Sequence, residues 1–322
     1  MCARARFRRC VVEAPATTAN LGPGFDVFGL ALDVAYDRVE LEVISDSGGV
    51  IEVQVDGPYA SEVPADASRN TAAVAVSEVL RELGIDVGLR LKLWKGVRPR
   101  CGLGSSGSSA AAAVVAVAKL LQLDLPPVKL VEYAARGEAV AAGHPHADNV
   151  APSILGGFTV IRSYRPLDVI SLEPPSNLGI VLAIPKIPVP KEKTKFAREV
   201  LPKSIELSKL VHNVGHAVYV ALGFALKNVD LIGRGMDDAV VEPARAKLIP
   251  GYHNVRKRAL EAGASGVAIS GAGPTMLAVV NLNKVNPEVV GEAMCEGFRE
   301  VGVEAEYVVT RPSRGARVLV LE

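Results

Sequence analysis

The sequence predicts a protein of the α+β class that is divided into two domains. Its 322 residues exceed the usual size of a single hydrophobic core. Segments with strand-like and helix-like patterns are mixed in both halves, which favours α+β over an all-parallel doubly wound sheet. A proline-rich stretch over residues 165–178 indicates a change of domain. We therefore divide the chain into residues 1–168 and residues 169–322.

The first half begins with valine- and isoleucine-rich runs, which predict antiparallel strands, and continues with apolar residues at helical spacing. The expected strands are residues 10–16, 25–33, 38–45, 50–57, 89–94 and 156–164, and the expected helices are 70–84, an alanine-rich helix after residue 109, and 126–143. The second half repeats this mixture. It is expected to contain strands at 178–184, 266–273, 275–281, 304–310 and 316–322, a helix-rich middle at 195–261, and a helix at 287–301.

Composition and charge limit the class of protein. Apolar residues make up 49% of the chain and charged residues 22%, as in a globular protein with a sizeable core. Lys plus Arg (36) nearly equal Asp plus Glu (35), so overall charge gives no reason to expect nucleic acid or a membrane as partner. Cys2, Cys10, Cys101 and Cys295 are scattered, which favours neither a disulfide framework nor a zinc site. With no signal-peptide pattern and no apolar run of spanning length, a cytoplasmic location is expected.

The stretch PRCGLGSSGSS, residues 99–109, has glycines that fit two nucleotide-binding patterns at first sight. Gly102, Gly104 and Gly107 satisfy G-x-G-x-x-G, but no strand directly precedes them and Asp124 cannot lie in a second parallel strand. A P-loop is excluded because no Gly-Lys-Ser/Thr follows. Two interpretations remain: a cradle in which backbone amides and a helix N-terminus hold phosphate, or a plain glycine-rich turn with a helix cap.

Neighbouring residues add to the phosphate interpretation. Ala110 to Ala113 allow the following helix to lie close to other backbone. Lys95 precedes the loop, where it could balance phosphate charge, and Glu138 could offer magnesium a carboxylate. Taken singly, Lys95 could equally be a surface lysine and Glu138 a structural carboxylate.

Three segments carry a resemblance to a known family. EAPATTANLGPGFDVFGLALD, PRCGLGSSGSSAAA and SGAGPTMLAVV resemble, in order and spacing, the three signature motifs of the GHMP kinases. HADNVAPSILGGFT and VEPARAKLIPGY extend the resemblance to nearly the whole chain. The first motif is similar to that of the branch that phosphorylates homoserine. The resemblance implies a ribosomal-S5-domain-2-like N-terminal domain, a ferredoxin-like C-terminal domain, and a substrate cleft between them.

The resemblance also implies where ATP and Mg²⁺ bind. Ser106 and Glu138 match the magnesium ligands, although another loop serine could take that place, and Lys95 matches the lysine near the transferred phosphate. Asn70 matches an adenine-side asparagine. The expected ATP-binding residues are Asn70, Pro99, Arg100, Cys101, Gly102, Leu103, Gly104, Ser105, Ser106, Gly107, Ser108 and Ser109.

A homoserine pocket needs carboxylates for the ammonium, arginines for the carboxylate, and a polar group at the hydroxyl. Residues matching substrate ligands of the family are Asn20, Asp26, His146, Asp148, Thr194, Arg198, Arg245 and Gly271. Without the family, Asn20 and Asp26 could be turn residues, Asp148 a helix cap, and the arginines partners in surface ion pairs.

The expected activity is transfer of the γ-phosphoryl group of MgATP to the side-chain hydroxyl of L-homoserine, giving O-phospho-L-homoserine on the way to threonine. Lys95 and Asp148 are the candidate catalytic residues, with Asp148 assigned as a ligand rather than as a base. A loose transition state lets positioning and charge neutralisation suffice. Alternatives are a mevalonate or shikimate kinase of the same family, or a catalytically silent ligand sensor. The sequence does not give the oligomeric state, although a homodimer is possible because family members are often dimers.

Overall fold

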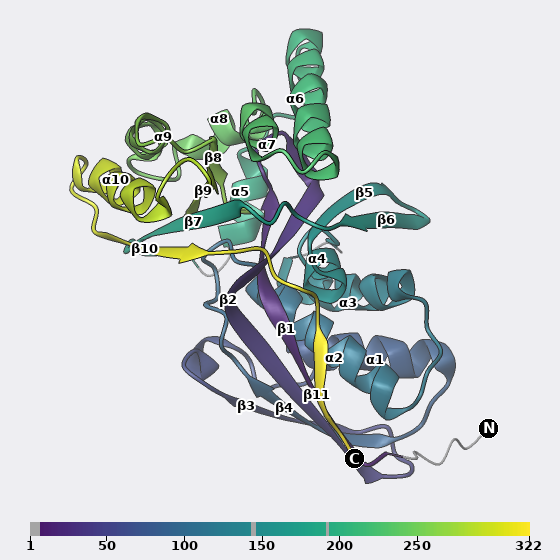
Figure 1. The fold of residues 1–322 in the computed structure, drawn as a ribbon. Coiled ribbons are helices and arrows are strands. Elements are labelled where there is room, and N and C mark those ends of the chain that lie inside the picture. The colour runs from purple at the N-terminus through teal and green to yellow at the C-terminus, as the bar shows by residue number, and fades with distance from the viewer. Residues whose placement is uncertain (1–6, 143–145, 191–192) are drawn as a thin grey trace.

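The computed structural model describes residues 7–142, 146–190 and 193–322, and its two β-sheets define two domains (Figure 1). The first sheet has the strand order β11-β1-β2-β4-β3, and β5 and β6 extend it from β2. Its strands are β1 (Arg9–Asn20), β2 (Gly24–Ser45), β3 (Ile51–Asp56), β4 (Gly88–Trp94), β5 (Phe158–Tyr164), β6 (Leu167–Leu172) and β11 (Arg317–Leu321). The helices of this domain are η1 (Ala60–Glu62), α1 (Thr71–Leu83), α2 (Ser105–Leu120), α3 (Pro127–Ala142) and α4 (Val150–Leu155).

The two strands expected at 25–33 and 38–45 are one continuous strand, β2. The intervening residues contain neither glycine nor proline, so nothing forces a turn there. Instead, the pairing with β1 steps from Leu32 opposite Ala16 to Tyr36 opposite Pro15, and the extra residues form a bulge. The expectation of purely antiparallel pairing is also wrong at one place, because β3 pairs with β4 in parallel.

Helix α2 lies in the middle of the first domain, against β1 and β2 on one side and α1 and α3 on the other (Figure 1). Ala110, Ala111, Ala112 and Ala113 are fully buried, so their small side chains allow this close approach, as the sequence predicted. The helix begins at Ser105, which places the serines of the predicted loop in its first turn and shortens the loop itself. Helix α4 was not predicted, because the sequence suggested a loop that leads directly into the strand at 156–164. The helix has only six residues.

The second domain is built on an antiparallel sheet with the order β10-β7-β9-β8. Its strands are β7 (Leu178–Pro185), β8 (Gly266–Ile269), β9 (Met276–Asn281) and β10 (Ala305–Thr310), and its helices are α5 (Lys193–Glu199), α6 (Leu207–Ala225), α7 (Val229–Gly235), α8 (Val241–Ala246), α9 (Tyr252–Glu261) and α10 (Pro287–Arg299). Helices α9 and α10 cover one face of the sheet. The other face packs against α6, α7 and the first domain, so β7 is buried along its whole length.

The domain interface is a continuous hydrophobic core. Phe158 of β5 stacks on Phe224 of α6 with ring centroids 3.8 Å apart, and Phe28 of β2 lies 5.1 Å from Phe158. The predicted boundary at residue 168 falls inside β6, which pairs with β5 and belongs to the first sheet. Strand β11 also returns to the first sheet, beside β1. The chain therefore enters the second domain after Leu172 and leaves it after Thr310.

Among the described residues, no helix combines the length and the apolar character that crossing a bilayer requires. Cys10, Cys101 and Cys295 are buried free thiols, whereas Cys2 lies outside the described residues.

Candidate active site

The backbone of the glycine-rich loop remains accessible at the start of α2 because its glycines permit an unusual path. Gly102 and Gly104 have φ values of +81° and +63°, a region that favours glycine. A Cβ on Gly104 would lie 2.8 Å from Asn149 Oδ1, and one on Gly102 would lie 2.9 Å from Gly273 O. The amides of Ser105, Ser106 and Gly107 stand in the first turn, where no intrahelical acceptor is available. This geometry suits an anion at the positive end of a long helix.

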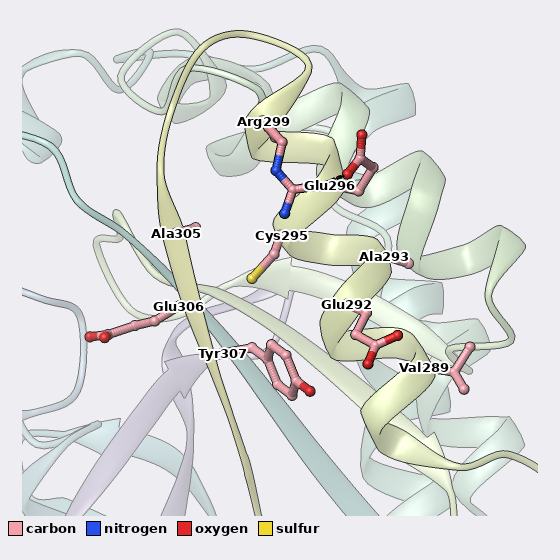
Figure 2. Close-up of a pocket in the computed structure, with 9 residues that line it drawn as sticks. All are labelled: Val289, Glu292, Ala293, Cys295, Glu296, Arg299, Ala305, Glu306 and Tyr307. Atoms are coloured by element: carbon pink, nitrogen blue, oxygen red, sulfur yellow. Dashed lines mark hydrogen bonds and ion pairs between the residues drawn. The ribbon is translucent and has the colours of Figure 1, made fainter.

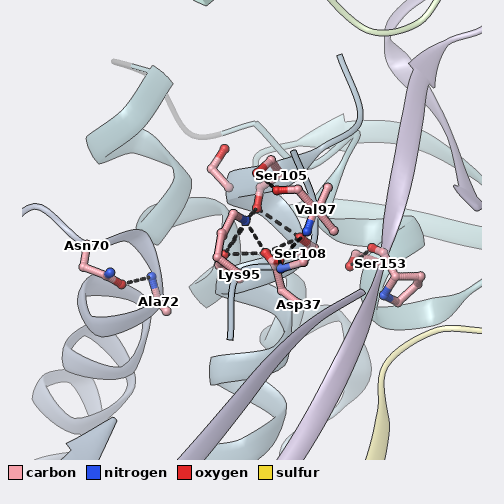
Figure 3. Close-up of polar contacts among 12 residues, drawn as sticks. Asp37, Asn70, Ala72, Lys95, Val97, Ser105, Ser108 and Ser153 are labelled. Atoms are coloured by element: carbon pink, nitrogen blue, oxygen red, sulfur yellow. Dashed lines mark hydrogen bonds and ion pairs between the residues drawn. The ribbon is translucent and has the colours of Figure 1, made fainter. Parts of the chain in front are cut away.

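A buried aspartate of β2, Asp37, holds this helix start from beneath (Figure 3). Its two carboxylate oxygens accept hydrogen bonds from Gly96 N (3.0 Å), Val97 N (2.9 Å), Ser108 Oγ (2.7 Å), Ser109 Oγ (2.6 Å) and Lys95 Nζ. Asp37 was not among the predicted site residues. One feature of the sequence could have pointed to it: Asp37 is a charged residue whose alternate neighbours along the strand are apolar. Because it lies between the two strands expected at 25–33 and 38–45, the pattern indicates a turn there instead.

Lys95 is part of this buried cluster, and its place near the transferred phosphate stays a prediction. Its side chain is 2% exposed, which also rules out an ordinary surface lysine. Besides Asp37, the Nζ group donates to Ser105 O at 2.5 Å and to Ser109 Oγ at 2.9 Å, so all three of its donors have partners. Burial lowers the pKa of Lys95, and the adjacent Asp37 opposes that shift. Lys95 thus supports the start of α2 through its bonds to Ser105 and Ser109.

Ser106 and Glu138 are brought together as predicted. Ser106 Oγ donates to Glu138 Oε1 at 2.5 Å, while Glu138 Oε2 is buried and has no hydrogen-bond partner. Burial raises the pKa of Glu138 to about 7, with Asp148 adding to the rise and Ser106 and Lys95 opposing it. A hydroxyl and an incompletely satisfied carboxylate are oxygen ligands of the kind that Mg²⁺ prefers, so these residues fit the ion.

On the opposite side of the loop, Asp26 and Arg198 bind one another. The Nη2 group of Arg198 donates to both carboxylate oxygens of Asp26, at 2.6 and 2.8 Å, and lies 3.2 Å from His146 Nδ1. Asp26 has a φ of +59° and its backbone amide donates to Asn20 Oδ1 at 3.2 Å. Both side chains of the ion pair are about one-quarter to one-third exposed (27% and 30%). The pair is therefore accessible to a competing charged group.

Arg245, Asn20 and Gly271 meet at one carbonyl. Gly271 O accepts hydrogen bonds from Asn20 Nδ2 (2.9 Å) and Arg245 Nη1 (3.1 Å), and Arg245 Nε donates to Ala197 O (3.1 Å). Burial, followed by the charge of Arg198, lowers the pKa of Arg245 to about 10. The predicted surface ion pair for Arg245 is thus excluded, because the residue is only 4% exposed.

Phe25 lies between the two arginines and was not predicted. Its ring centre is 5.1 Å from Arg198 Cζ and 5.2 Å from Arg245 Cζ, within the range of cation–π attraction. The aromatic residue inside the glycine-rich turn before Asp26 was the available signal. Its ring brings two guanidinium groups close together despite their repulsion.

Asp148 is 5% exposed and lies in the field of Asp26. Burial and then the charge of Asp26 raise its pKa to about 7, and Arg198 opposes the rise. The cap of α4 is Asn149, so the helix-cap alternative for Asp148 is wrong. Thr194 lies in α5 one turn before Arg198, with an exposed side chain.

Two predicted ATP ligands have side chains that bind other parts of the protein. Asn70 is fully buried and caps α1: its Oδ1 accepts from Ala72 N (Figure 3). Its Oδ1 also accepts from Ala73 N, and its Nδ2 donates to Pro64 O. One N–H of Nδ2 remains beside the bond to Pro64 O, so the adenine contact of Asn70 stays a prediction. Arg100 forms an ion pair with Glu62.

Lys193, at the start of α5, was also missed. It donates to Arg100 O at 3.3 Å and to Gly273 O, and so links the glycine-rich loop to the turn after β8. Burial lowers its pKa to about 7. Lysines at every second position are typical of an exposed surface, so nothing in the sequence indicated that Lys193 links the two segments.

A surface pocket of about 790 Å³ lies elsewhere, between α10 and β10 (Figure 2). Its lining includes Glu292, Arg299 and Tyr307, and none of its lining residues belongs to the predicted ATP or substrate set. The predicted site and this pocket are therefore separate features.

Comparison with known proteins gives consistent relatives. Residues 70–157 match the model of the GHMP kinases N terminal domain, and residues 221–300 match that of the GHMP kinases C terminal. A homoserine kinase of Methanococcus vannielii is 42% identical over 85% of this chain and 88% of that protein. One from Pyrococcus abyssi is 39% identical over 95% of this chain and 98% of its own. The crystal structure of homoserine kinase from Cytophaga hutchinsonii has a TM-score of 0.88 and 38% identity, covering 98% of this chain and 99% of that chain.

Proposed function

Since the chain belongs to the GHMP kinases and, within them, to the homoserine kinases, we propose that it transfers the γ-phosphoryl group of ATP to the side-chain hydroxyl of L-homoserine. The products are ADP and O-phospho-L-homoserine, the phosphorylated alcohol that leads to threonine. The expected two-domain GHMP kinase fold is confirmed. One observation carries the proposal in this chain: an amide-lined helix start with a Ser106–Glu138 pair stands beside two aspartates and two arginines.

We assign the ATP phosphates to the loop from Pro99 to Gly104 and to the first turn of α2. The supporting observations are the positive φ values of Gly102 and Gly104 and the amides of Ser105 to Gly107. Asp37 and Lys95 fix this turn by hydrogen bonds before any ligand is present, which lowers the entropy lost on binding. Asn70 is left out of this phosphate assignment because its predicted contact is with adenine.

Ser106 and Glu138 are assigned as the residues that would hold Mg²⁺. When bound, the ion neutralises negative charge on the phosphates during transfer. Glu138 Oε2 supplies an unused lone pair toward it, and the burial of Glu138 keeps bulk water from competing for that oxygen.

The substrate pocket is assigned from charge. Asp26 and Asp148 provide two carboxylates for the ammonium of homoserine, and Arg198 and Arg245 provide guanidinium groups for its carboxylate. Gly271 joins this pocket to the loop: it bonds to Arg245 and Asn20, and the neighbouring Ser270 Oγ donates to Gly102 O at 2.7 Å. These contacts support a position of the acceptor hydroxyl on the side of the phosphates.

The chemistry rests on alignment and charge. In a loose phosphoryl-transfer transition state, the new bond to the attacking oxygen is little formed, so the hydroxyl gains little positive charge and its proton can leave without a strong base. Helix α2 directs its positive end toward the phosphates, and the two arginines hold the acceptor at its far end. Asp148 acts as a ligand of the ammonium.

A mevalonate or shikimate kinase is not favoured, because those acceptors carry no ammonium to balance Asp26 and Asp148. ADP release should be measured with homoserine, mevalonate, shikimate and galactose as acceptors. We expect turnover with homoserine alone. Turnover with another acceptor would contradict the proposal, and ligand binding without ADP release would indicate a sensor.

We further propose that the protein works in the cytoplasm as a homodimer. Helix α6 supports the dimer, because it exposes an apolar stripe at helical spacing that includes Leu207, Val211, Val214 and Val218. Sedimentation should show a dimer that Val214→Asp dissociates. The free thiols of Cys10, Cys101 and Cys295 agree with a reducing compartment.

A further inference from the structure

His212, His216 and Asp237 form a cluster away from the proposed active site. The two histidines lie four residues apart on α6, and Asp237 follows α7 in the segment that leads to α8. One ligand atom from each side chain lies within 4.8 Å of the other two. The imidazole rings stack with centroids 3.9 Å apart and an interplanar angle of 19°, so one ring must tilt before both in-plane nitrogen lone pairs can point at a single ion. Three potential ligands thus converge from two separate elements.

The separations suit a small, tetrahedral metal ion. His212 Nε2 lies 3.2 Å from Asp237 Oδ2. Two ligands bound to one zinc ion at about 2.0 to 2.1 Å are roughly 3.3 Å apart in tetrahedral geometry. In addition, His212 Nε2 is closed to solvent and makes no hydrogen bond of acceptable geometry. An orphaned ring nitrogen beside a carboxylate is a polar arrangement that a cation would complete.

The surrounding hydrogen bonds orient the ligands. His216 Nδ1 is 2.8 Å from His212 O, and a carbonyl can only accept, so this nitrogen carries the proton and Nε2 keeps its lone pair. Arg256 Nη2 donates to Asp237 Oδ1 at 2.7 Å and leaves Oδ2 facing the histidines. Outer hydrogen bonds of this kind fix the tautomer and direction of metal ligands.

We propose that His212, His216 and Asp237 bind a transition-metal ion of the Zn²⁺ class, with a water as fourth ligand. Two imidazoles favour such ions over Mg²⁺, which prefers oxygen. The ion would tie α6 to the segment before α8, the helix that carries Arg245. That segment also lies against the turn containing Gly22, since a Cβ there would be 3.4 Å from Asp237 N. The metal would therefore stabilise the elements that border the proposed substrate pocket, without itself contacting the substrate.

Calorimetric titration of the metal-free protein with Zn²⁺, and Co²⁺ absorption spectra, test the site without nucleotide present. We expect one ion per chain and a tetrahedral Co²⁺ spectrum. His216→Ala should weaken Zn²⁺ binding at least tenfold and remove that spectrum, whereas His253→Ala, at an exposed histidine of α9, should change neither.

Thermal unfolding gives a second readout. Zn²⁺ should raise the Tm of the wild type and of His253→Ala, but not that of His216→Ala or Asp237→Asn. If His216→Ala does not fold, Asp237→Asn alone decides, since it keeps the shape of the side chain. Zn²⁺ binding that is unchanged in these variants, or no stoichiometric binding at all, would show that the cluster is an ordinary His–Asp contact.

Discussion

The two sides of the proposed active site are built in different ways. Beneath the glycine-rich loop, Asp37 and Lys95 are almost completely buried and every contact joins parts of the protein to one another. On the substrate side, Asp26 and Arg198 are partly exposed and hold each other through an ion pair. The first arrangement fixes a backbone shape permanently. In the second, Asp26 and Arg198 can exchange each other for the ammonium and carboxylate of a zwitterion. Because they are partly exposed, their desolvation penalty is smaller than that of a fully buried pair.

The largest effect is expected from breaking the buried side. Asp37→Ala would leave the Lys95 ammonium buried without its carboxylate and would remove the shorter of the two acceptors of Ser108 and Ser109. We expect a loss of about 3 to 5 kcal/mol in the free energy of unfolding, measured in denaturant.

Asp124→Ala is the control for that variant, because Asp124 is an exposed aspartate of the loop between α2 and α3. It should change stability by less than about 0.5 kcal/mol. Equal effects of both substitutions would mean that the Asp37 cluster has no special structural role.

The next largest effect is expected at Arg245. Its substitution should separate the effect on homoserine binding from the effect on ATP binding. Arg245→Ala would leave the substrate carboxylate without its guanidinium partner, so kcat/KM for homoserine should fall by the equivalent of about 2 to 5 kcal/mol. The KM for ATP should stay nearly constant. Lys247→Ala, at an exposed neighbour, serves as control in the same steady-state assay. Loss of ATP affinity with intact homoserine affinity would reverse the roles assigned to the two sides.

A pH dependence is expected on the substrate side. Burial raises the pKa of Asp148 to about 7, so this carboxyl is protonated below that pH and no longer attracts an ammonium group. The KM for homoserine should therefore increase as the pH falls below 7, approaching about tenfold per pH unit. Asp148→Asn should raise the KM at pH 8 and flatten the profile. An unchanged profile in Asp148→Asn would assign the titration to another group.

The smallest effect is expected at Lys193, which connects the two sides through Arg100 O and Gly273 O. Lys193→Met removes these hydrogen bonds but retains much of the buried apolar volume. We expect kcat/KM for ATP to change by about 1 kcal/mol, with Lys186→Met at an exposed position as control. A loss of several orders of magnitude would instead indicate that Lys193 touches the transferred phosphate.

The sequence predicted those parts of the site that depend on local pattern. The glycines of the loop and the alanines of α2 follow from backbone freedom and side-chain size. The pairing of Ser106 with Glu138 came from the family resemblance. The fold assignment came from motif resemblance.

Features that depend on distant partners could not be predicted in the same way. Asp37 and Lys95 are separated by 58 positions, and only the pairing of β2 with β4 brings them together. Asn70 illustrates the converse problem, because one residue type can serve a helix cap or a ligand equally well. The long strand β2 was divided in error since a bulge, unlike a turn, needs no glycine or proline.

The return of β11 to the first sheet has a consequence for how the molecule can be cut and rejoined. A fragment that ended after β6 would expose the edge of β1 and invite aggregation. In the whole chain, however, Arg9 N donates to Glu322 O at 2.9 Å, so the start of β1 and Glu322 lie side by side. A short peptide joining them would allow new termini to be opened in a surface loop, giving a circular permutant that keeps this edge covered.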